Sequence, residues 1–545
     1  MTRPDLKRKR EVKNICCIGG GYVGGPSAAV IANKAPHLQI TVVDIDERRI
    51  AAWNSDSLPV YEPNLFQLVQ PARDGSEGRK PNLVFSTAIE EKIQEADIIF
   101  IGVNTPTKKT GLGAGKASDL GWLEAATRRV AKAAQRDTIV VEKSTVPVGT
   151  ADAMREILAA NAQPGVHFEV LSNPEFLAEG TAVTNLLNPD RILIGCLETE
   201  AGYAAAEALC DVYANWIPRE KLITMNLWSS ELSKLAANAL LAQRISSINA
   251  LSSICEAVSA NIQDVSYAVG LDTRIGPKMM NASVGFGGSC FRKDILNLVY
   301  ISETLNLPEV AAYWKAVVEV NEYQMARFVK RIVHAMHSTL SNKKVAVLGF
   351  AYKKDTGDTR ESPAITVVQK LLAENATIHI FDPKVRKEQI YADLQTTLDD
   401  ARIAVQDNPY DACQDAHAVI ILTEWDMFSN KPPKSGKIPQ QNGHLAVDTN
   451  GNGNGNGSSS NNKLAESTDG AVSTDTGSST PDSIPTRAKS PGPKHERLDW
   501  KRISQLMEKP MHVFDGRNTV NVAALEDLGF RVEAIGVASK SRSLR

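Results

Sequence analysis

A glycine-rich turn near the start of the chain limits the possible folds more than any other feature of this sequence. Gly19, Gly21 and Gly24 follow the apolar run 14–18, and Asp44 ends the next apolar run, 20 residues after Gly24. In a strand-turn-helix unit, such glycines let backbone N–H groups and the helix N-terminus approach a pyrophosphate, and the acidic side chain accepts hydrogen bonds from the ribose. The alternative is a turn that only packs a helix on a strand. We expect a dinucleotide site, and we favour NAD over NADP because Asp44 would repel a 2′-phosphate.

The spacing of apolar runs predicts the fold class. Short apolar runs alternate with helical patterns in both halves of the chain, which is typical of parallel sheets with helices on both faces. The predicted strands are 14–18, 40–43, 98–101 and 138–141 in the first half, and 344–349, 378–381, 418–422 and 512–514 in the second. The expected fold is α/β, with two Rossmann-like doubly wound domains joined by a long central helix region.

The region between the two halves is helical in pattern. Residues 226–269 contain neither proline nor glycine, which predicts one long, largely buried helix, and a further helical stretch covers 310–340. Residues 431–494 consist of Asn-Gly repeats, serine runs and scattered prolines, a composition typical of disorder. The predicted parts are a basic N-terminal tail (1–11), a first Rossmann domain (12–225), a central helical region (226–340), a second Rossmann-like domain (341–430 and 495–530), a disordered insertion (431–494) and a C-terminal tail (531–545).

Charge and cysteine content exclude several other classes of protein. With 61 basic and 63 acidic residues, the chain has no field that favours nucleic acid or an anionic membrane as partner. We find no secretory segment and no apolar run long enough to span a bilayer, so a cytoplasmic location is expected. Seven cysteines without a Cys-x-x-Cys spacing indicate neither a disulfide framework nor a zinc site. His334 and His337 lack a third ligand at recognisable spacing, so no metal is expected.

A cysteine after a flexible glycine loop is the first candidate for chemistry. Cys290 follows Gly287, Gly288 and Ser289, and Asp294 lies one turn later if a helix begins there. Thiolates attack aldehydes, and a nearby cation or helix N-terminus lowers a thiol pKa. Lys234 or Lys293 would supply that charge. A cysteine in this setting can be purely structural, but beside a dinucleotide fold we favour the nucleophile.

The predicted long helix carries a second candidate group. Glu231, Lys234 and Asn238 are spaced to share one helix face with the small residues around them. They form either a solvated stripe or the wall of a cleft between the two halves.

Together these motifs resemble the UDP-glucose 6-dehydrogenases, within the UDP-glucose/GDP-mannose dehydrogenase family, over nearly the whole chain. The segments that carry the resemblance are 19–25 (with Tyr22 and Val23), 103–107 (VNTPT), 142–147 (EKSTVP), 173–180 (NPEFLAEG), 231–238, 285–294 and 353–362 (KKDTGDTRES). The resemblance assigns NAD to the first domain, dimerisation to the central region and the UDP-sugar to the second domain.

The resemblance also implies a mechanism. UDP-glucose would be oxidised to UDP-glucuronate, a precursor for glycan and polysaccharide synthesis, by two hydride transfers to two NAD+. Cys290 matches the nucleophile that forms a thiohemiacetal and then a thioester. Lys234 matches the residue that deprotonates the alcohol or stabilises oxyanions, with Asn238 as a neighbouring donor. Thr145, Asp294 and Glu175 match positions that order water or move protons, and Glu175 is the expected hydrolytic base.

The family pattern extends to binding residues. The implied NAD residues are Gly19, Gly21, Tyr22, Val23, Gly24, Asp44, Arg49, Val103, Thr105, Pro106, Ser144, Thr145, Glu179 and Arg360. The implied UDP-glucose residues are Glu175, Phe176, Leu177, Lys234, Asn238, Arg274, Phe286, Gly287, Tyr352, Lys353 and Arg517. Arg274 would come from a neighbouring subunit, which implies a homo-oligomer of dimer units, with a hexamer as the expected form.

Some features depart from the family pattern. The extension before Val12 and the 431–494 insertion lie outside it, and Asn281 stands where animal members carry a basic residue, a change that bears on substrate affinity and assembly. Two other functions fit the same residues less well. One is a dehydrogenase of another nucleotide sugar, and the other is a non-catalytic UDP-sugar sensor, which would have no need for a nucleophile.

Overall fold

The computed structural model describes residues 11–397, 400–432 and 496–538. The predicted basic tail, except Glu11, and almost all of the predicted insertion lie outside these described residues. Among the helices described, none is both long enough and apolar enough to cross a membrane.

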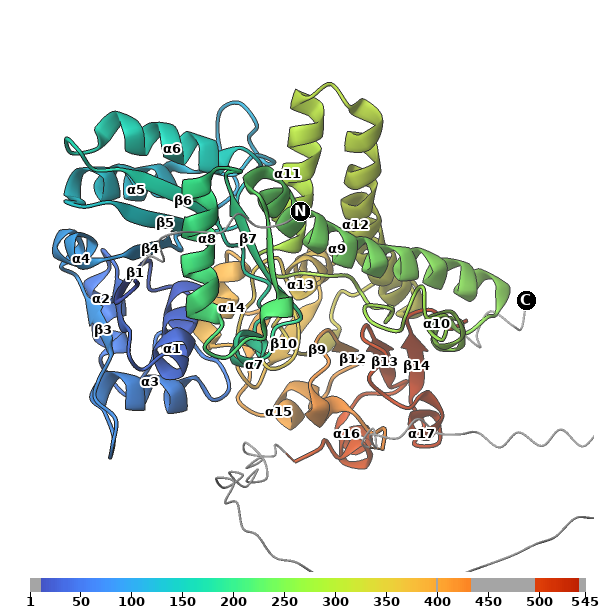
Figure 1. The fold of residues 1–545 in the computed structure, drawn as a ribbon. Helices are drawn as coiled ribbons and strands as arrows, with labels where there is room; N and C mark the ends of the chain where they lie inside the picture. Colours follow the sequence, from blue (N-terminus) through green and yellow to red (C-terminus); the bar gives the residue numbers. More distant parts are fainter. Residues whose placement is uncertain (1–10, 398–399, 433–495, 539–545) are drawn as a thin grey trace, which may run out of the picture. The chain divides into compact units, whose positions relative to one another are not determined.

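The first domain contains an eight-stranded sheet in the order β3-β2-β1-β4-β5-β6-β7-β8 (Figure 1). Its strands are β1 (Asn14–Ile18), β2 (Gln39–Val43), β3 (Leu83–Ser86), β4 (Ile98–Ile101), β5 (Thr138–Glu142), β6 (Phe168–Ser172), β7 (Ile192–Cys196) and β8 (Leu222–Asn226). Its helices are α1 (Gly24–Lys34), α2 (Glu47–Trp53), α3 (Leu65–Asp74), α4 (Ile89–Glu95), α5 (Gly121–Ala133), α6 (Thr150–Asn161), α7 (Ala182–Leu187) and α8 (Glu200–Tyr213). All four strands predicted here are confirmed. The strand order reverses between β1 and β4, which places a crevice at the carboxyl ends of these two strands.

One part of this sheet differs from the predicted parallel arrangement. β7 pairs with β6 in the antiparallel direction, through Ser172 and Gly195, and β8 then runs parallel to β7. The connection from β6 to β7 contains only the six-residue helix α7. Because that connection does not cross back along the sheet, the next strand enters in the opposite direction.

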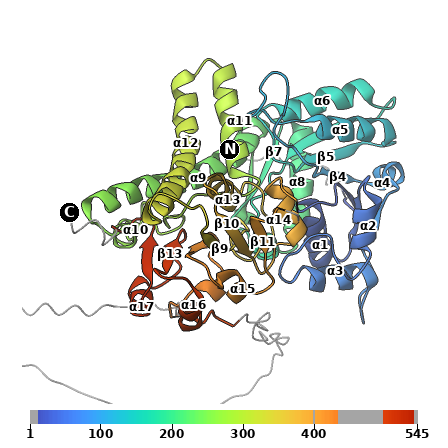
Figure 2. The same ribbon diagram turned by 180° about the vertical axis from the view of Figure 1, so that it is seen from behind.

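The central region contains four helices rather than the predicted two. They are α9 (Leu227–Val258), α10 (Ile262–Gly270), α11 (Phe291–Thr304) and α12 (Pro308–Ala335); α11 and α12 pack side by side (Figure 2). The predicted single helix breaks at Ser259, which adopts the left-handed conformation (φ 60°), and Asn261 then caps α10 by accepting a hydrogen bond from Gln263 N. A polar side chain that caps a new helix competes with continuation of the preceding helix, and the spacing of apolar residues does not reveal such a break.

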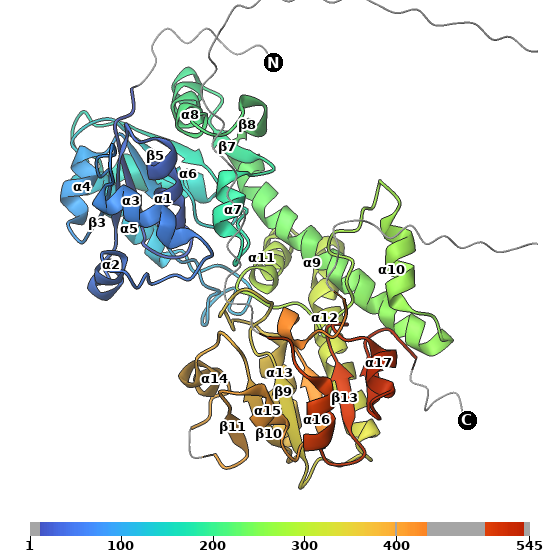
Figure 3. The same cartoon turned by 90° about the horizontal axis from the view of Figure 1, so that it is seen from below.

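The second domain contains a six-stranded parallel sheet in the order β11-β10-β9-β12-β13-β14 (Figure 3). Its strands are β9 (Lys344–Leu348), β10 (Thr377–Phe381), β11 (Ile403–Val405), β12 (Ala418–Ile421), β13 (His512–Asp515) and β14 (Arg531–Ala534), and its helices are α13 (Pro363–Ala373), α14 (Lys387–Asp393), α15 (Pro409–Cys413), α16 (Trp500–Leu506) and α17 (Val522–Glu526). Residues 531–545 were expected to form a tail, but 531–534 form the edge strand β14. Its four residues (RVEA) alternate between charged and apolar side chains, but so short a run is a weak strand signal by itself, and the pairing with β13 establishes it as a strand.

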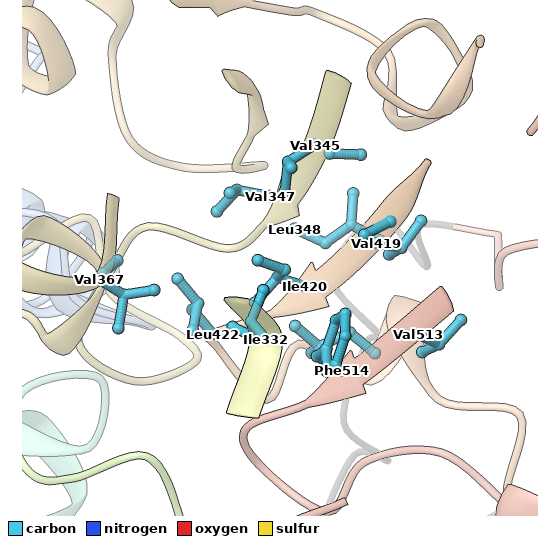
Figure 4. Close-up of a cluster of buried hydrophobic side chains, with 14 of the residues drawn as sticks. Ile332, Val345, Val347, Leu348, Val367, Val419, Ile420, Leu422, Val513 and Phe514 are labelled. Carbon is cyan, nitrogen blue, oxygen red and sulfur yellow. The ribbon is translucent and has the colours of Figure 1, made fainter. Parts of the chain in front are cut away.

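A continuous apolar core holds this sheet against the helices that cover it. Val347 of β9, Ile420 of β12 and Phe514 of β13 are almost completely buried, and they lie together with Ile332 of α12 and Val367 of α13 (Figure 4). The strands are fixed in register by this packing, so the loops at their carboxyl ends have defined positions. The loops after β9 and β13 carry three of the predicted substrate residues, Tyr352, Lys353 and Arg517.

Candidate active site

A buried ion pair lies at the centre of the predicted catalytic residues. Lys234 lies on α9 and Glu175 lies in the loop after β6, and Lys234 Nζ is 3.1 Å from Glu175 Oε1. Both side chains are less than a tenth exposed. Glu175 Oε2 accepts a hydrogen bond of 2.7 Å from Leu177 N, which fixes the carboxylate orientation. The Lys234 ammonium also lies 5.2 Å from the ring centroid of Phe176.

A second polar pair joins α9 to α11. Asn238 Nδ2 donates to Asp294 Oδ2 at 2.6 Å, and Lys293 Nζ is 3.1 Å from Asp294 Oδ1. Asp294 is fully buried. Lys234 and Asn238 therefore face the same cluster, so the alternative of a solvated stripe is excluded for these two residues. Glu231, on the same helix, instead accepts hydrogen bonds from Gly149 N and Ala151 N at the start of α6.

Cys290 completes the cluster as the N-cap residue of α11. Burial and the nearby Asp294 and Glu175 carboxylates raise the pKa of the thiol above its ordinary value, although Lys234 and a contact with Ser289 oppose the shift. From the sequence we expected a lowered pKa, with Lys234 or Lys293 supplying the charge. The direction of that expectation was wrong, because burial, which is the largest effect, and the Asp294 and Glu175 carboxylates outweigh the charge of Lys234, while Lys293 pairs with Asp294.

The state of Lys234 follows from the same surroundings. Burial by itself would lower its pKa, but the charges of Glu175, Cys290 and Asp294 outweigh this effect and raise the pKa above the ordinary value. Lys234 is therefore an ammonium at neutral pH. In that state it donates hydrogen bonds and stabilises an oxyanion, and it cannot accept a proton.

The glycine turn after β1 fits a dinucleotide. A side chain on Gly24 would overlap the Gly19 carbonyl group, so the turn must be this tight, whereas a Cβ on Gly21 would meet no atom within 4 Å. The space beside Gly21 is thus open, as the approach of a pyrophosphate to the turn requires. At the end of β2, Asp44 accepts hydrogen bonds from Gly20 N and Arg49 Nη1, both at 2.8 Å. Burial opposes the charge on Asp44, but these hydrogen bonds lower the pKa of its carboxyl group, so it is an anionic acceptor for a ribose.

The loops after β4 and β5 lie together on the other side of the crevice. Thr105 Oγ1 donates to the Thr145 carbonyl at 2.7 Å, and Ser144 Oγ donates to the Val103 carbonyl at 2.7 Å. Pro106 O accepts a hydrogen bond from Asp119 N. These contacts bring together the loops that carry the predicted NAD residues, as expected for strands that are neighbours in the sheet.

The predicted NAD residues Glu179 and Arg360 form a contact between loops far apart in sequence. Arg360 Nη2 lies 2.9 Å from Glu179 Oε1 and also contacts Asp358. Burial, followed by the adjacent Asp358 carboxylate, raises the pKa of Glu179 to about 8. Next to this contact, Tyr22 OH of the glycine turn accepts a hydrogen bond from Gly180 N at 3.3 Å.

The predicted sugar-nucleotide residues lie around the glycine loop before Cys290. Gly287 can carry no side chain, because a Cβ there would overlap the Glu361 carbonyl, and Gly288 packs against the ring of Tyr352. Phe286 is buried and held by Asn321 through its backbone N–H and carbonyl. Arg517 donates to the Leu422 and Tyr352 carbonyls, and the Lys353 ammonium lies 5.5 Å from the Tyr352 ring centroid.

Comparison with known proteins supports the same site. The NAD binding, central and UDP binding domains of the UDP-glucose/GDP-mannose dehydrogenase family match residues 13–217, 228–323 and 346–451. The chain belongs to the UDP-glucose/GDP-mannose dehydrogenase family. It is 50% identical over 537 residues to UDP-glucose 6-dehydrogenase 1 of Glycine max, covering 96% of each chain. It is 47% identical over 542 residues to UDP-glucose 6-dehydrogenase of Bos taurus, covering 98% of this chain and 95% of the relative.

A solved structure of the family has the same fold. The UDP-glucose dehydrogenase from the hyperthermophilic archaeon Pyrobaculum islandicum is 34% identical and aligns with a TM-score of 0.67, covering 78% of this chain and 92% of that one. The predictions of family, fold and NAD as cofactor are thereby confirmed.

One predicted residue of this family member lies away from the cluster. The Arg274 side chain is 87% exposed and pairs with Asp272, two residues away. The structure therefore does not bring Arg274 to the site of its own chain.

Sequence reasoning missed a polar group beside Glu175. Lys143 Nζ donates to Asn173 Oδ1 at 2.8 Å and to Tyr213 OH at 3.3 Å, and all three side chains are buried. Lys143 and Asn173 stand inside motifs already recognised, so their positions in the sequence were a usable signal. Tyr213 had no such signal. Arg191, also missed, stacks on Phe176 with its guanidinium 3.7 Å from the ring centroid.

Proposed function

We propose that this protein is an NAD-dependent UDP-glucose 6-dehydrogenase that carries out the four-electron oxidation of UDP-glucose to UDP-glucuronate. The observation that carries the proposal is the convergence of Lys234, Glu175, Asn238 and Asp294 on Cys290 in a chain with a dinucleotide turn. The relatives from Glycine max and Bos taurus are UDP-glucose 6-dehydrogenases, which supports the choice of UDP-glucose.

The NAD residues of the first domain would hold NAD+, which would accept one hydride in each of the two oxidation steps. In the first oxidation the O6 hydroxyl proton would pass to the Glu175 carboxylate and from there to solvent. Lys234, as an ammonium, would stabilise the resulting O6 oxyanion and then the aldehyde oxygen, with Asn238 as a second donor. The Cys290 sulfur would attack the aldehyde carbon to form a thiohemiacetal. Since the thiol pKa is raised, its proton must leave as the C–S bond forms, and the Asp294 and Glu175 carboxylates are the nearby acceptors.

Loss of the second hydride would convert the thiohemiacetal into a thioester. Glu175 would then accept a proton from water as the water oxygen bonds to the thioester carbon. The C–S bond breaks, the sulfur regains a proton and the carboxylic acid is released. Lys234 holds Glu175 in place for this step through the 3.1 Å ion pair.

The stoichiometry of the reaction tests the proposal. UDP-glucose is exhausted in the presence of excess NAD+, and NADH is measured per sugar consumed. The four-electron mechanism requires about two NADH with UDP-glucuronate as product, because each hydride transfer removes two electrons. A ratio near one would mean that the aldehyde is released, and Cys290→Ser should fail to complete the cycle. Parallel assays with GDP-mannose and a UDP-acetamidosugar test the choice of substrate.

We also propose a cytoplasmic homo-oligomer of dimer units, with a hexamer as its form and Arg274 reaching the UDP-sugar of a neighbouring subunit. Exposed apolar side chains on α9 and α10, including Leu240, Ile254 and Tyr267, support association. Arg274→Ala and Cys290→Ser subunits, each inactive alone, should regain activity when mixed, because some sites then receive an intact Arg274 and an intact Cys290. No recovery in mixtures that have exchanged subunits would refute a shared site.

A further inference from the structure

A cavity of about 100 Å³ lies next to the loop that carries Glu175. Buried Lys143 and Tyr213 line one part of it, and Asn188 and Asp190, both exposed, line another. Of the five groups in the catalytic cluster, all of them in the described part of the chain, Glu175 alone lines this cavity. The cavity therefore joins the expected hydrolytic base to residues at the protein surface.

The inner part of the cavity suits water. A single water needs roughly 10–15 Å³ and two or more polar partners, so the volume is ample. Lys143 is only 5% exposed, and its ammonium has three N–H groups. Two of them are directed to the neutral acceptors Asn173 Oδ1 and Tyr213 OH, and Tyr213 OH itself donates to Asn173 Oδ1 at 2.6 Å. One N–H group of a cavity-lining cation is thus available to a water molecule.

The charge of Lys143 also acts on Glu175. Burial lowers the pKa of Lys143 to about 8, while Glu175 opposes the shift, so the side chain is largely an ammonium at neutral pH. A water between Lys143 and Glu175 would donate to the carboxylate and accept from the ammonium, which directs one of its protons toward the base. On the other side, Glu175 is occupied by Lys234, and the sugar and nicotinamide would fill the space near Cys290.

We propose that this cavity is the path by which the hydrolytic water reaches Glu175, and that Lys143 is a positioning residue that orients this water. The inference rests on the proposed function, because oxidation to the acid consumes one water in each cycle, whereas a reaction that stops at the aldehyde consumes none. In the step concerned, the water oxygen bonds to the thioester carbon, one water proton passes to Glu175, and the C–S bond breaks to return the Cys290 sulfur.

Two variants test the path from different ends. Lys143→Met removes the ammonium but keeps a similar volume, and Asn188→Phe narrows the outer part of the cavity without changing any group near Cys290. Thr184→Phe is the matched control, because Thr184 is exposed on α7 but does not line the cavity. Rapid mixing with UDP-glucose and excess NAD+ follows NADH formation, and mass spectrometry after acid quenching measures the UDP-glucuronyl adduct on Cys290.

Both cavity variants should form the first two NADH per site at the wild-type rate and then turn over more slowly. For Lys143→Met the loss should be about tenfold, the effect of one lost hydrogen bond to water, and Asn188→Phe should slow the same step by restricting the path of the water. The adduct should accumulate in both, and Thr184→Phe should match the wild type. A purely structural role for Lys143 would slow the hydride transfers as well. If both cavity variants hydrolyse the adduct at the wild-type rate, the inference is wrong. If wild-type enzyme forms fewer than two NADH per sugar, the proposed function itself fails.

Discussion

Removing the Lys234 ammonium should destabilise the protein and impair catalysis by separable amounts. Lys234→Met leaves the Glu175 carboxylate buried, with its direct cationic partner, 3.1 Å away, gone. Loss of one partner from a buried pair typically costs about 3–5 kcal/mol of unfolding free energy. Loss of an oxyanion donor lowers kcat by roughly 10²–10³-fold, which is about 2.7–4 kcal/mol.

The second variant separates these two effects. Glu175→Gln added to Lys234→Met removes the uncompensated charge while keeping the volume, so most of the lost stability should return but the activity should not. Urea unfolding of both variants and of the wild type measures the first effect, and steady-state kinetics measures the second. If Lys234→Met loses less than about 1 kcal/mol of stability, a value typical of an exposed pair, or if the double variant is no more stable than the single one, the reasoning about the buried pair is wrong.

Three further predictions concern other parts of the site. Because the pKa of Cys290 is raised, its alkylation rate without substrates should still increase above pH 9, and Lys234→Met should raise the apparent pKa further; a plateau near neutral pH would contradict this. Burial raises the pKa of Glu179 from 4.5 to about 8, so its contribution to stability is fully present below pH 4.5 and is lost as the pH rises toward 8. The urea midpoint of the wild type should therefore fall across this range, and Glu179→Gln should make that fall smaller. An equally steep fall in the variant would contradict the raised pKa of Glu179. Gly21→Ala should weaken NAD binding, measured by calorimetry, without lowering the melting temperature. Gly24→Ala should lower both the NAD affinity and the melting temperature, because its Cβ would overlap the Gly19 carbonyl. Equal losses of melting temperature in the two variants would contradict the geometry of the turn.

Local patterns were enough to predict both Rossmann-like domains, because strand burial and the glycine turn depend on residues that are neighbours in sequence. The strand 14–18, the turn at Gly19 and the second unit from 344 were all visible in this way. The candidate catalytic residues were found from short motifs rather than from the spacing of apolar residues. The resemblance of these motifs to one family gave Cys290 and Lys234 their expected roles.

The tertiary structure alone decided how those residues act on one another. Glu175 reaches Lys234 across 59 positions, and Asn238 reaches Asp294 across 56, because the end of β6, α9 and α11 pack together. Burial then raises the thiol pKa of Cys290 where the sequence suggested the reverse. The antiparallel β7 and the Lys143 cavity likewise arise from packing between distant segments. Desolvation and charge pairing depend on distances in space, and a linear pattern of residue types does not contain them.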